Sequence, residues 1–225
     1  MAGRDAAGSV ESGMRVGLGT GSTVAHFLLH LGDRIAGGEL SDVVGVPTSI
    51  RTETAALELG IPLRTLGELG ALDLTVDGAD EVDPRLNLIK GLGGAMLREK
   101  MVAQASRRML AIVDDTKLVG RLGERAPVPV EVIPFEFASH LPWLERMGAE
   151  PVVRRSEDGS RYVTDNGNFV IDCHFAGGVP DPRAFDEALA GRAGLVESGL
   201  FLEMADEAVV AGQTGVYRMT GEDSR

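Results

Sequence analysis

The sequence predicts an α/β protein with a parallel sheet in its main domain and a smaller α+β domain. Strand-like apolar runs alternate with amphipathic helical patterns through the first half of the chain, as in sheets joined by right-handed crossovers. After residue 126, prolines punctuate a β-rich run and the expected order of elements becomes β-α-β-β-α-β. A length of 225 residues suits one domain with a smaller companion.

The main domain is predicted from residues 1–126 and 199–225. Val24, Phe27, Leu28 and Leu31 lie on one face of a helical pattern and mark the first amphipathic helix. Strands are expected at residues 14–18, 42–46, 62–65, 72–76 and 110–113, and helices at residues 23–35, 49–59 and 95–109. Two more strands, at residues 208–210 and 216–219, are expected to return to the same sheet.

The smaller domain is predicted from residues 127–198. Strands are expected at residues 128–133, 151–155, 169–173 and 195–201, and helices at residues 138–147 and 182–190. This order is the split-βαβ, or ferredoxin-like, pattern.

The formal net charge is −12, from 22 basic and 34 acidic residues. Nucleic acids and anionic membranes require clustered positive charge, so neither is an expected partner. The first ten residues contain no apolar signal core, and no run approaches the ~18 apolar residues of a membrane span. We therefore expect a soluble cytoplasmic protein. The single Cys173 cannot form an internal disulfide and is expected to be buried.

A glycine-rich turn, Gly17-Leu18-Gly19-Thr20-Gly21-Ser22-Thr23, joins the first strand to the first amphipathic helix. Glycines let a backbone approach a ligand closely, and hydroxyl groups at a helix N-terminus attract anions. The turn lacks the Gly-Lys-Ser/Thr of a P-loop, and Ser22 stands where a dinucleotide fingerprint has its third glycine. The next strand runs into Pro47-Thr48-Ser49 rather than an acid for a ribose hydroxyl. A mononucleotide or sugar phosphate is therefore the expected ligand, rather than NAD.

The segment from Asp77 to Lys100 is where the chemistry is expected. Its strand ends in the acidic run Asp77-Gly78-Ala79-Asp80-Glu81, and open parallel sheets bind ligands at the carboxyl ends of their strands. Lys90 then precedes a glycine-rich turn, Gly91 to Gly94, which leads into a helix bearing Glu99. Another strand end carries Lys117 and is expected in the same crevice.

Seven motifs follow one another along nearly the whole chain. They are GLGTGSTV at 17–24, VVGVPTS at 43–49, DGADEVD at 77–83, KGLGGAMLREK at 90–100, PVPVEVIPF at 127–135, TDNGN at 164–168 and GLFLEMADEAVVAG at 199–212. Together they resemble ribose-5-phosphate isomerases of type A, and the combination of DGADE with KGLGGAMLREK is the most specific part. The resemblance implies a Rossmann-like main domain with a small ferredoxin-like domain.

The resemblance implies an aldose–ketose isomerase of the non-oxidative pentose phosphate pathway. Such an enzyme interconverts D-ribose 5-phosphate and D-ribulose 5-phosphate through an enediol, without a metal or other cofactor. Glu99 would be the base that moves the proton between C2 and C1. The resemblance further implies Asp77, Asp80 and Lys90 as catalytic residues, and Thr20, Gly21, Ser22, Thr23, Asp77, Gly78, Ala79, Asp80, Lys90, Gly91, Leu92, Gly93 and Lys117 as substrate-binding residues. We also expect a homodimer or homotetramer.

These residue types suit the chemistry. A single carboxylate can remove a proton beside a carbonyl and return it one carbon away if its pKa is tuned. Lys90 and the amides of residues 91–94 are candidates for stabilising the enediolate oxygen. Asp77 and Asp80 could serve ring opening and the sugar hydroxyls, since clustered carboxylates divide acid and base roles. Spacing alone, however, favours a surface position for Glu99, between Arg98 and Lys100.

One departure from the family concerns the phosphate. Its members usually begin with a longer helix whose lysine helps to hold that group, and the present N-terminus is expected to be too short to supply it. Arg4 is the candidate substitute.

Two alternatives differ in class from the isomerase. A non-catalytic sugar-phosphate sensor would use the acids only to grip hydroxyls, and it would need no base beside an enediolate donor. The presence of both Glu99 and Lys90 therefore favours the isomerase over the sensor. The other alternative is a Mg²⁺ or Ca²⁺ site made from Asp77, Asp80, Glu81 and Asp83, whose irregular spacing lacks the EF-hand pattern.

Overall fold

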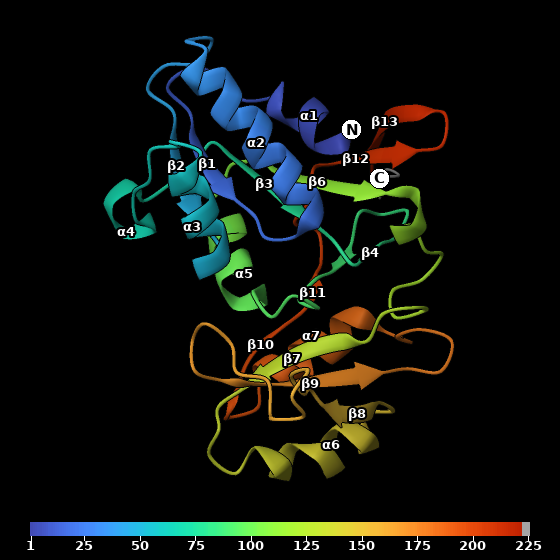
Figure 1. The fold of residues 1–225 in the computed structure, drawn as a ribbon. Coiled ribbons are helices and arrows are strands. Elements are labelled where there is room, and N and C mark those ends of the chain that lie inside the picture. Colours follow the sequence, from blue (N-terminus) through green and yellow to red (C-terminus); the bar gives the residue numbers. More distant parts are fainter. Residues whose placement is uncertain (222–225) are drawn as a thin grey trace.

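The computed structural model describes residues 1–221, in which the chain forms three sheets (Figure 1). The largest has six strands in the order β13-β12-β6-β3-β1-β2. Its parallel strands are β1 (Arg15–Leu18), β2 (Val44–Pro47), β3 (Leu74–Gly78), β6 (Met109–Asp114) and β12 (Glu207–Gly212), and β13 (Gly215–Thr220) is antiparallel to β12. The expected α/β class with a mostly parallel sheet is confirmed, as is the return of both C-terminal strands to that sheet.

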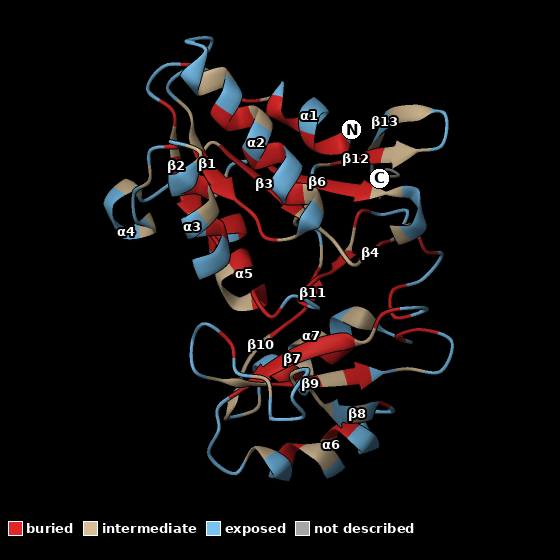
Figure 2. Cartoon of the chain, viewed as in Figure 1, coloured by how far each residue is buried: buried red, intermediate tan, exposed pale blue. Residues whose placement is uncertain are grey.

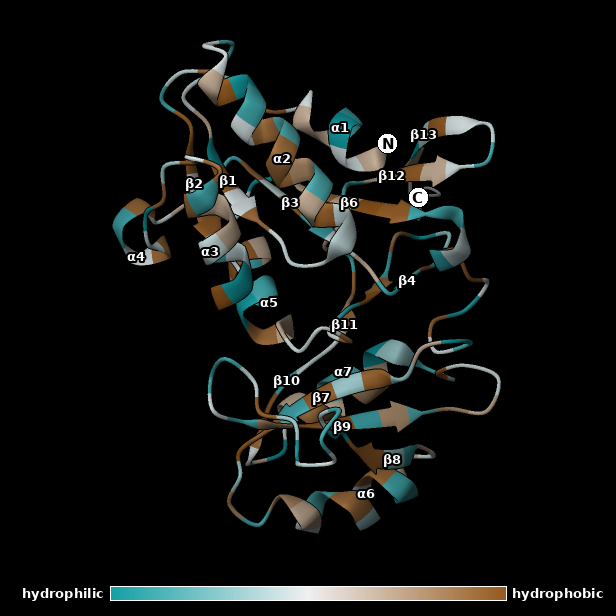
Figure 3. Ribbon diagram, viewed as in Figure 1, coloured by the Kyte–Doolittle hydropathy of each residue, from teal (hydrophilic) through white to brown (hydrophobic). Residues whose placement is uncertain are grey.

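Helices cover this sheet, and the longest of them, α2, packs on it by its apolar face. The helices of this part are α1 (Ala2–Ala7), α2 (Ser22–Ala36), α3 (Ile50–Glu58), α4 (Leu66–Leu69) and α5 (Met96–Gln104). In α2 the four predicted apolar residues are all buried, and Figure 3 shows hydrophobic and hydrophilic residues on different sides of this helix. Helix α1, which the sequence did not predict, packs its buried alanines against the same core.

A second, four-stranded sheet lies below the first in Figure 1. Its strands, in the order β10-β7-β9-β8, are β7 (Val128–Val132), β8 (Glu150–Val153), β9 (Phe169–His174) and β10 (Leu195–Ser198), and all neighbours are antiparallel. A 3-10 helix η2 (Phe137–His140), helix α6 (Leu141–Arg146) and helix α7 (Pro182–Ala190) complete this part.

The four-stranded sheet has a core of its own. Val128, Val130 and Val132 of β7 pack with Ile171 of β9 and Phe185 of α7, and Figure 2 shows this buried band separate from that of the large sheet. On this basis we propose the division into a main domain of residues 1–126 and 199–225, of which 222–225 lie outside the described residues, and a ferredoxin-like domain of residues 127–198.

A third, three-stranded sheet lies between the two larger ones (Figure 1). It consists of β4 (Glu81–Val82), β5 (Leu88–Ile89) and β11 (Leu200–Phe201), none of which was predicted as a separate strand. The prediction of one continuous strand over residues 195–201 is wrong. This segment divides at Gly199, whose N–H donates to the Pro129 carbonyl at 2.7 Å, so that β10 pairs with β7 and β11 pairs with β5.

Three other predicted elements need correction. Residues 62–65 form a single bridge between Leu63 and Gly45 rather than a strand, because Thr65 already caps α4. The helix predicted to reach residue 109 ends at Gln104, and Met109 begins β6, where its N–H donates to Asp206 Oδ2 at 2.7 Å. The helix predicted over 138–147 is the 3-10 helix η2 followed by α6. Among residues 1–221, no helix is both long and apolar enough to cross a membrane.

Candidate active site

The carboxyl ends of β1, β3 and β6 bring most of the predicted site residues to one cavity of about 130 Å³. The turn after β1 supplies Thr20 to Thr23, β3 ends at Gly78, and Lys117 lies in the 3-10 helix η1 (Asp115–Lys117) after β6. The cavity is lined by Thr20, Gly21, Ser22, Thr23, Val24, Arg51, Gly78, Ala79, Asp80, Lys90, Gly91, Gly93, Glu99 and Lys117. Of the predicted residues, only Asp77 and Leu92 are not part of this lining.

Asp77 lies behind the lining as a fully buried carboxylate, with an exposed fraction of 0%. Its Oδ1 accepts the N–H groups of Thr20 at 3.0 Å and of Gly78 at 2.7 Å. Its Oδ2 lies 3.0 Å from Lys90 Nζ. A Cβ at position 19 would come within 2.2 Å of Asp77 Oδ1, so the glycine there is what lets the turn close over this carboxylate.

Lys90 connects Asp77 to Glu99. Its Nζ lies 3.3 Å from Glu99 Oε2 and donates to the Gly78 carbonyl at 2.5 Å. Lys90 and Glu99 are only 2% and 4% exposed. The surface position that spacing alone favoured for Glu99 is therefore wrong, because the first turn of α5 faces the cavity.

Burial sets the protonation behaviour of this trio. Burial raises the pKa of Glu99 to about 8, and the neighbouring Asp77 carboxylate adds to the rise, while Lys90 opposes it. Burial also raises the pKa of Asp77, against the opposing effects of Lys90 and the two amides. Burial by itself would lower the pKa of Lys90, but Asp77 and Glu99 raise it above its usual value. Lys90 thus stays charged, while Glu99 can exchange a proton near neutral pH.

Asp80 and the glycine turn form another wall of the cavity. Asp80 Oδ2 accepts the Leu92 N–H at 2.9 Å, and the Leu92 side chain is exposed and is not part of the lining. Leu92 therefore contributes its backbone to the site rather than its side chain.

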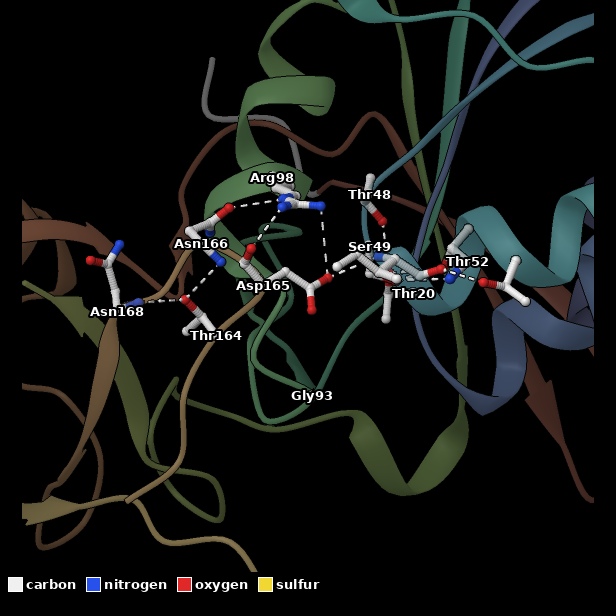
Figure 4. Close-up of polar contacts among 12 residues, drawn as sticks. Thr20, Thr48, Ser49, Thr52, Gly93, Arg98, Thr164, Asp165, Asn166 and Asn168 are labelled. Carbon is white, nitrogen blue, oxygen red and sulfur yellow. Dashed lines mark hydrogen bonds and ion pairs between the residues drawn. The ribbon is translucent and has the colours of Figure 1, made fainter. Parts of the chain in front are cut away.

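In the turn after β1, Thr20 is fixed by hydrogen bonds, whereas the hydroxyls of Ser22 and Thr23 are available to a ligand. Thr20 Oγ1 lies 2.8, 2.8 and 3.0 Å from the hydroxyl oxygens of Thr48, Ser49 and Thr52, a cluster drawn in Figure 4. This cluster fastens the turn to the end of β2 and the start of α3. Ser22 and Thr23, by contrast, begin α2 beside the cavity, where N–H groups of the first turn lack helical partners.

Arg51, in the first turn of α3, is a lining residue that sequence reasoning missed. Its position after the strand end at Pro47 is the signal that could have suggested it. The ion pairs and side-chain hydrogen bonds found among residues 1–221 do not involve the side chains of Arg51 or Lys117, so neither of these two lining cations is held in an ion pair. Arg4, the expected substitute for a phosphate-binding lysine, is exposed on α1 and does not line the cavity.

The four acids of DGADEVD do not converge on one point. The Glu81 carboxylate accepts the backbone N–H groups of Gly123, Arg125 and Ala126 at 2.5, 2.7 and 2.7 Å. Asp83 instead accepts the N–H groups of Arg85 and Asn87, both at 2.8 Å. Within residues 1–221, no group of three or more His, Cys, Asp or Glu side chains is arranged to hold a metal ion. The arrangement does not support the hypothesis of a site built from these four carboxylates.

A larger hollow of about 470 Å³ lies elsewhere, beside Pro47, Leu63, Arg98 and Met101. It contains neither the Asp77–Lys90–Glu99 trio nor the glycine turn, and its lining is mainly apolar. The smaller, polar cavity is therefore the candidate active site.

Comparison with known proteins agrees with this geometry. The family model for ribose 5-phosphate isomerase A (phosphoriboisomerase A) matches residues 44–215. The chain is 51% identical to ribose-5-phosphate isomerase A of Roseiflexus castenholzii, covering 96% of this chain and 92% of that one. It is 49% identical to the enzyme of the same name from Chloroflexus aurantiacus, covering 99% and 93%.

Solved structures give the same result. A D-ribose-5-phosphate isomerase in complex with phospho-erythronic acid is 40% identical, with a TM-score of 0.94 and coverage of 97% of this chain and 96% of that one. Ribose 5-phosphate isomerase A from Methanocaldococcus jannaschii is 39% identical, with a TM-score of 0.92 and the same coverage. With its cavity, its fold and its sequence in agreement along nearly its whole length, the chain belongs to the ribose 5-phosphate isomerase A family.

Proposed function

We propose that the protein interconverts D-ribose 5-phosphate and D-ribulose 5-phosphate through an enediol, as an isomerase of the non-oxidative pentose phosphate pathway. The observation that carries this proposal is the pairing of a buried carboxylate, Glu99, with a buried ammonium, Lys90, 3.3 Å apart beside a glycine turn. A protein that only senses a sugar phosphate has no use for a base placed against a donor for a negative oxygen. The pairing therefore favours catalysis over the sensor hypothesis.

Glu99 removes the proton from C2 of the open-chain aldose and returns it to C1 of the ketose. A pKa of about 8 suits both steps, because the carboxylate is basic enough to take the proton and its acid is strong enough to return it. The negative charge that develops on the enediolate oxygen faces Lys90 and the N–H groups of the glycine turn. Asp77 holds Lys90 charged and in place, and Asp80 accepts hydrogen bonds from sugar hydroxyls.

The phosphate is held at the other end of the cavity. The start of α2 offers unpaired N–H groups and the hydroxyls of Ser22 and Thr23, which suit an anion. Lys117 and Arg51 supply the positive charge that a phosphate dianion needs, because Lys90 is already compensated by Asp77 and Glu99. We propose that Arg51 performs the role for which Arg4 was expected.

The test is incubation of the purified, folded protein with D-ribose 5-phosphate and detection of the ketose product. We expect the two sugar phosphates to reach equilibrium, and we expect exhaustive treatment with EDTA to leave the rate unchanged. Absence of any ketose would contradict the proposed function. Activity lost with EDTA and restored by Mg²⁺ or Zn²⁺ would contradict the metal-free mechanism alone.

The assembly and the location are also proposals. We propose a homodimer or homotetramer, which light scattering coupled to size-exclusion chromatography distinguishes from a monomer of 23.7 kDa. We propose that the protein works in the cytoplasm. The buried thiol of Cys173, whose pKa burial raises to about 12, fits a reducing compartment in which it serves only as packing.

A further inference from the structure

The four-stranded sheet contacts the glycine turn through Arg154, which follows β8. The Arg154 side chain is only 10% exposed. Its Nε donates to Asp172 Oδ2 at 2.9 Å, and its Nη2 donates to the other oxygen of the same carboxylate. Its Nη1 donates to the carbonyls of Gly91 at 2.8 Å and of Leu92 at 3.0 Å. A planar guanidinium held on one side by a bidentate carboxylate thus presents its third nitrogen to two successive peptide carbonyls.

These two bonds fix the directions of the neighbouring N–H groups. In a trans peptide the carbonyl and the following N–H point in opposite directions, and the described residues contain no cis peptide. The Gly91 carbonyl faces Arg154, and the following N–H, of Leu92, donates to Asp80 Oδ2 at 2.9 Å on the opposite side. The Leu92 carbonyl also faces Arg154, so the N–H of Gly93 points away from Arg154.

Gly93 lines the cavity, and its N–H has no acceptor among the hydrogen bonds of residues 1–221. A backbone N–H of a lining residue that lacks a protein partner is a donor available to a ligand in the cavity. Lys90 lines the same cavity. Gly93 and Lys90 thus bring a backbone N–H and an ammonium group to one cavity.

Tyr162 adds a second restraint on the turn. Its hydroxyl donates to the Gly93 carbonyl at 3.2 Å, and the Arg154 guanidinium lies 5.6 Å from the centre of its ring. A Cβ at position 94 would come within 2.1 Å of the Tyr162 oxygen, and Gly94 has a φ of +76°. The ring therefore packs directly on a backbone that only glycine accommodates at that point.

Arg154 and Tyr162 both lie in the connection between β8 and β9. This connection also contacts α5, the helix that carries Glu99 (Figure 4). Arg98 donates to Asn166 Oδ1 at 2.8 Å and to the Asp165 carbonyl at 2.9 Å, and Asp165 Oδ2 accepts the Ile50 N–H at 2.8 Å. The loop is held in turn by buried Glu131, whose Oε1 accepts from the side chains of Thr164, Asn166 and Asn168 at 2.9, 3.1 and 2.8 Å. The Gly91–Gly94 turn and helix α5 are thus both held by the connection between β8 and β9 of the four-stranded sheet.

We infer that Arg154, oriented by Asp172, is a positioning residue for the reaction: it sets the peptide planes of the Gly91–Gly93 turn so that the Gly93 N–H faces the enediolate oxygen. This inference rests on the proposed isomerase activity. Arg154 does not line the cavity and acts only through the backbone that it holds.

The test compares Arg154→Lys with a matched control, Arg183→Lys, whose arginine forms an exposed ion pair with Glu203 on the same part of the molecule. A lysine cannot hold Asp172 bidentately and two carbonyls together. We expect Arg154→Lys to lower kcat by about 10- to 100-fold, because a misplacement of about 1 Å at the reacting centre can cost about 100-fold, with KM changed by no more than several-fold. The control should retain the wild-type kcat.

Two inhibitors separate positioning from a merely structural role. The inhibition constant of phospho-erythronic acid, whose carboxylate places negative charge at the reacting end, should rise with the loss of kcat. The inhibition constant of inorganic phosphate should stay unchanged, because its contacts lie on α2, Arg51 and Lys117. Tyr162→Phe, which removes one restraint and no charge, should lower kcat by a smaller factor, and it carries the test if Arg154→Lys fails to fold.

Several results would overturn the inference. One is a folded Arg154→Lys protein with kcat within twofold of the wild type; another is equal weakening of both inhibitors. If Arg154→Lys does not fold, a wild-type kcat in Tyr162→Phe would overturn it. A wild type that forms no ketose would overturn the proposed function and the inference with it, and this outcome is recognisable because the unaltered protein is itself inactive.

Discussion

Asp77, Lys90 and Glu99 are three ionisable side chains that are almost fully buried. Lys90 Nζ lies 3.0 Å from Asp77 Oδ2 and 3.3 Å from Glu99 Oε2. Burying a charge is costly unless it is paired. Asp77, with two backbone N–H groups and the ammonium, is the better-supported anion, so the Asp77–Lys90 pair is neutral as a unit. Glu99 then lacks a full counter-charge and binds its proton more tightly. Burial and the Asp77 carboxylate thus raise the pKa of Glu99 into the range that suits the proposed role of a base at neutral pH.

The first prediction concerns the pH dependence of kcat/KM, which reports ionisations of the free enzyme. Glu99 must be deprotonated to act, and its pKa is raised to about 8. We therefore expect kcat/KM to rise with pH and to level above about pH 8. At pH 6 it should be about one hundredth of the plateau, because two pH units separate that condition from the pKa. A profile that is flat from pH 5.5 to 8.5 would contradict the role of Glu99 as the base.

The second prediction concerns stability. The native pKa of Glu99 is raised from 4.5 to about 8, so between these values the native state binds more protons than the unfolded state. The contribution of Glu99 to the free energy of unfolding is therefore fully present below about pH 4.5 and is lost as pH rises towards 8. Glu99→Gln removes this dependence. We expect the stability of the variant relative to the wild type, measured by urea unfolding, to increase between pH 5 and pH 8; a constant difference would contradict the raised pKa.

At the scale of elements, the starts of α2 and α3 form the end of the cavity where we propose that the phosphate binds. Helix α2 was well predicted because its apolar residues recur on one face and the glycine turn marks its beginning. The end of α5 could not be predicted, since residues 105–109 continue a helix-compatible composition. What stops the helix is remote: the Leu72 N–H donates to the Ala105 carbonyl at 2.8 Å, and Asp206 accepts the Met109 N–H.

The third prediction tests this phosphate site. Thr23→Val removes a hydroxyl donor and Arg51→Ala removes a cation, while the Glu99 region is left intact. Both changes should raise KM for ribose 5-phosphate far more than they lower kcat, because the lost contacts act on the phosphate in ground state and transition state alike. Arg64→Ala, an exposed arginine that does not line this cavity, is the control and should be neutral. An unchanged KM in both variants would move the phosphate to another part of the cavity.

At the scale of the whole molecule, the site depends on contacts between parts far apart in sequence. The alternation of strands and helices, the parallel sheet and most of the lining residues could be predicted, because these follow from local periodicity and from the ends of strands. Arg51 and Arg154 were not predicted. The one sequence signal for Arg51 is its position after the strand end at Pro47. Arg154 has no such signal, because its place at the second glycine turn depends on long-range side-chain hydrogen bonds to the carbonyls of Gly91 and Leu92.

The fourth prediction concerns Glu81 of β4, in the three-stranded sheet. It binds the segment that precedes β7 of the four-stranded sheet. Its buried carboxylate accepts three backbone N–H groups, and an alanine would leave all three without a partner. Buried donors left unsatisfied cost about 1–3 kcal/mol each, so Glu81→Ala should lower the free energy of unfolding by at least about 3 kcal/mol. Glu39→Ala, which breaks an exposed ion pair with Arg34, should cost less than about 1 kcal/mol. Equal effects of the two changes in chemical denaturation would contradict a structural role for Glu81.

The central claim is that Glu99 carries the proton between C2 and C1, and the most direct measurement is solvent deuterium exchange with Glu99→Gln. This change keeps the size of the side chain and removes the base. In heavy water the wild type should introduce deuterium at C2 of recovered ribose 5-phosphate and at C1 of ribulose 5-phosphate. The variant should not, and its kcat should fall by at least ~10²–10⁴-fold, with substrate binding within several-fold. Exchange at the wild-type rate in the variant, or more than about a tenth of the wild-type kcat, would contradict the claim and move the base to Asp77 or Asp80.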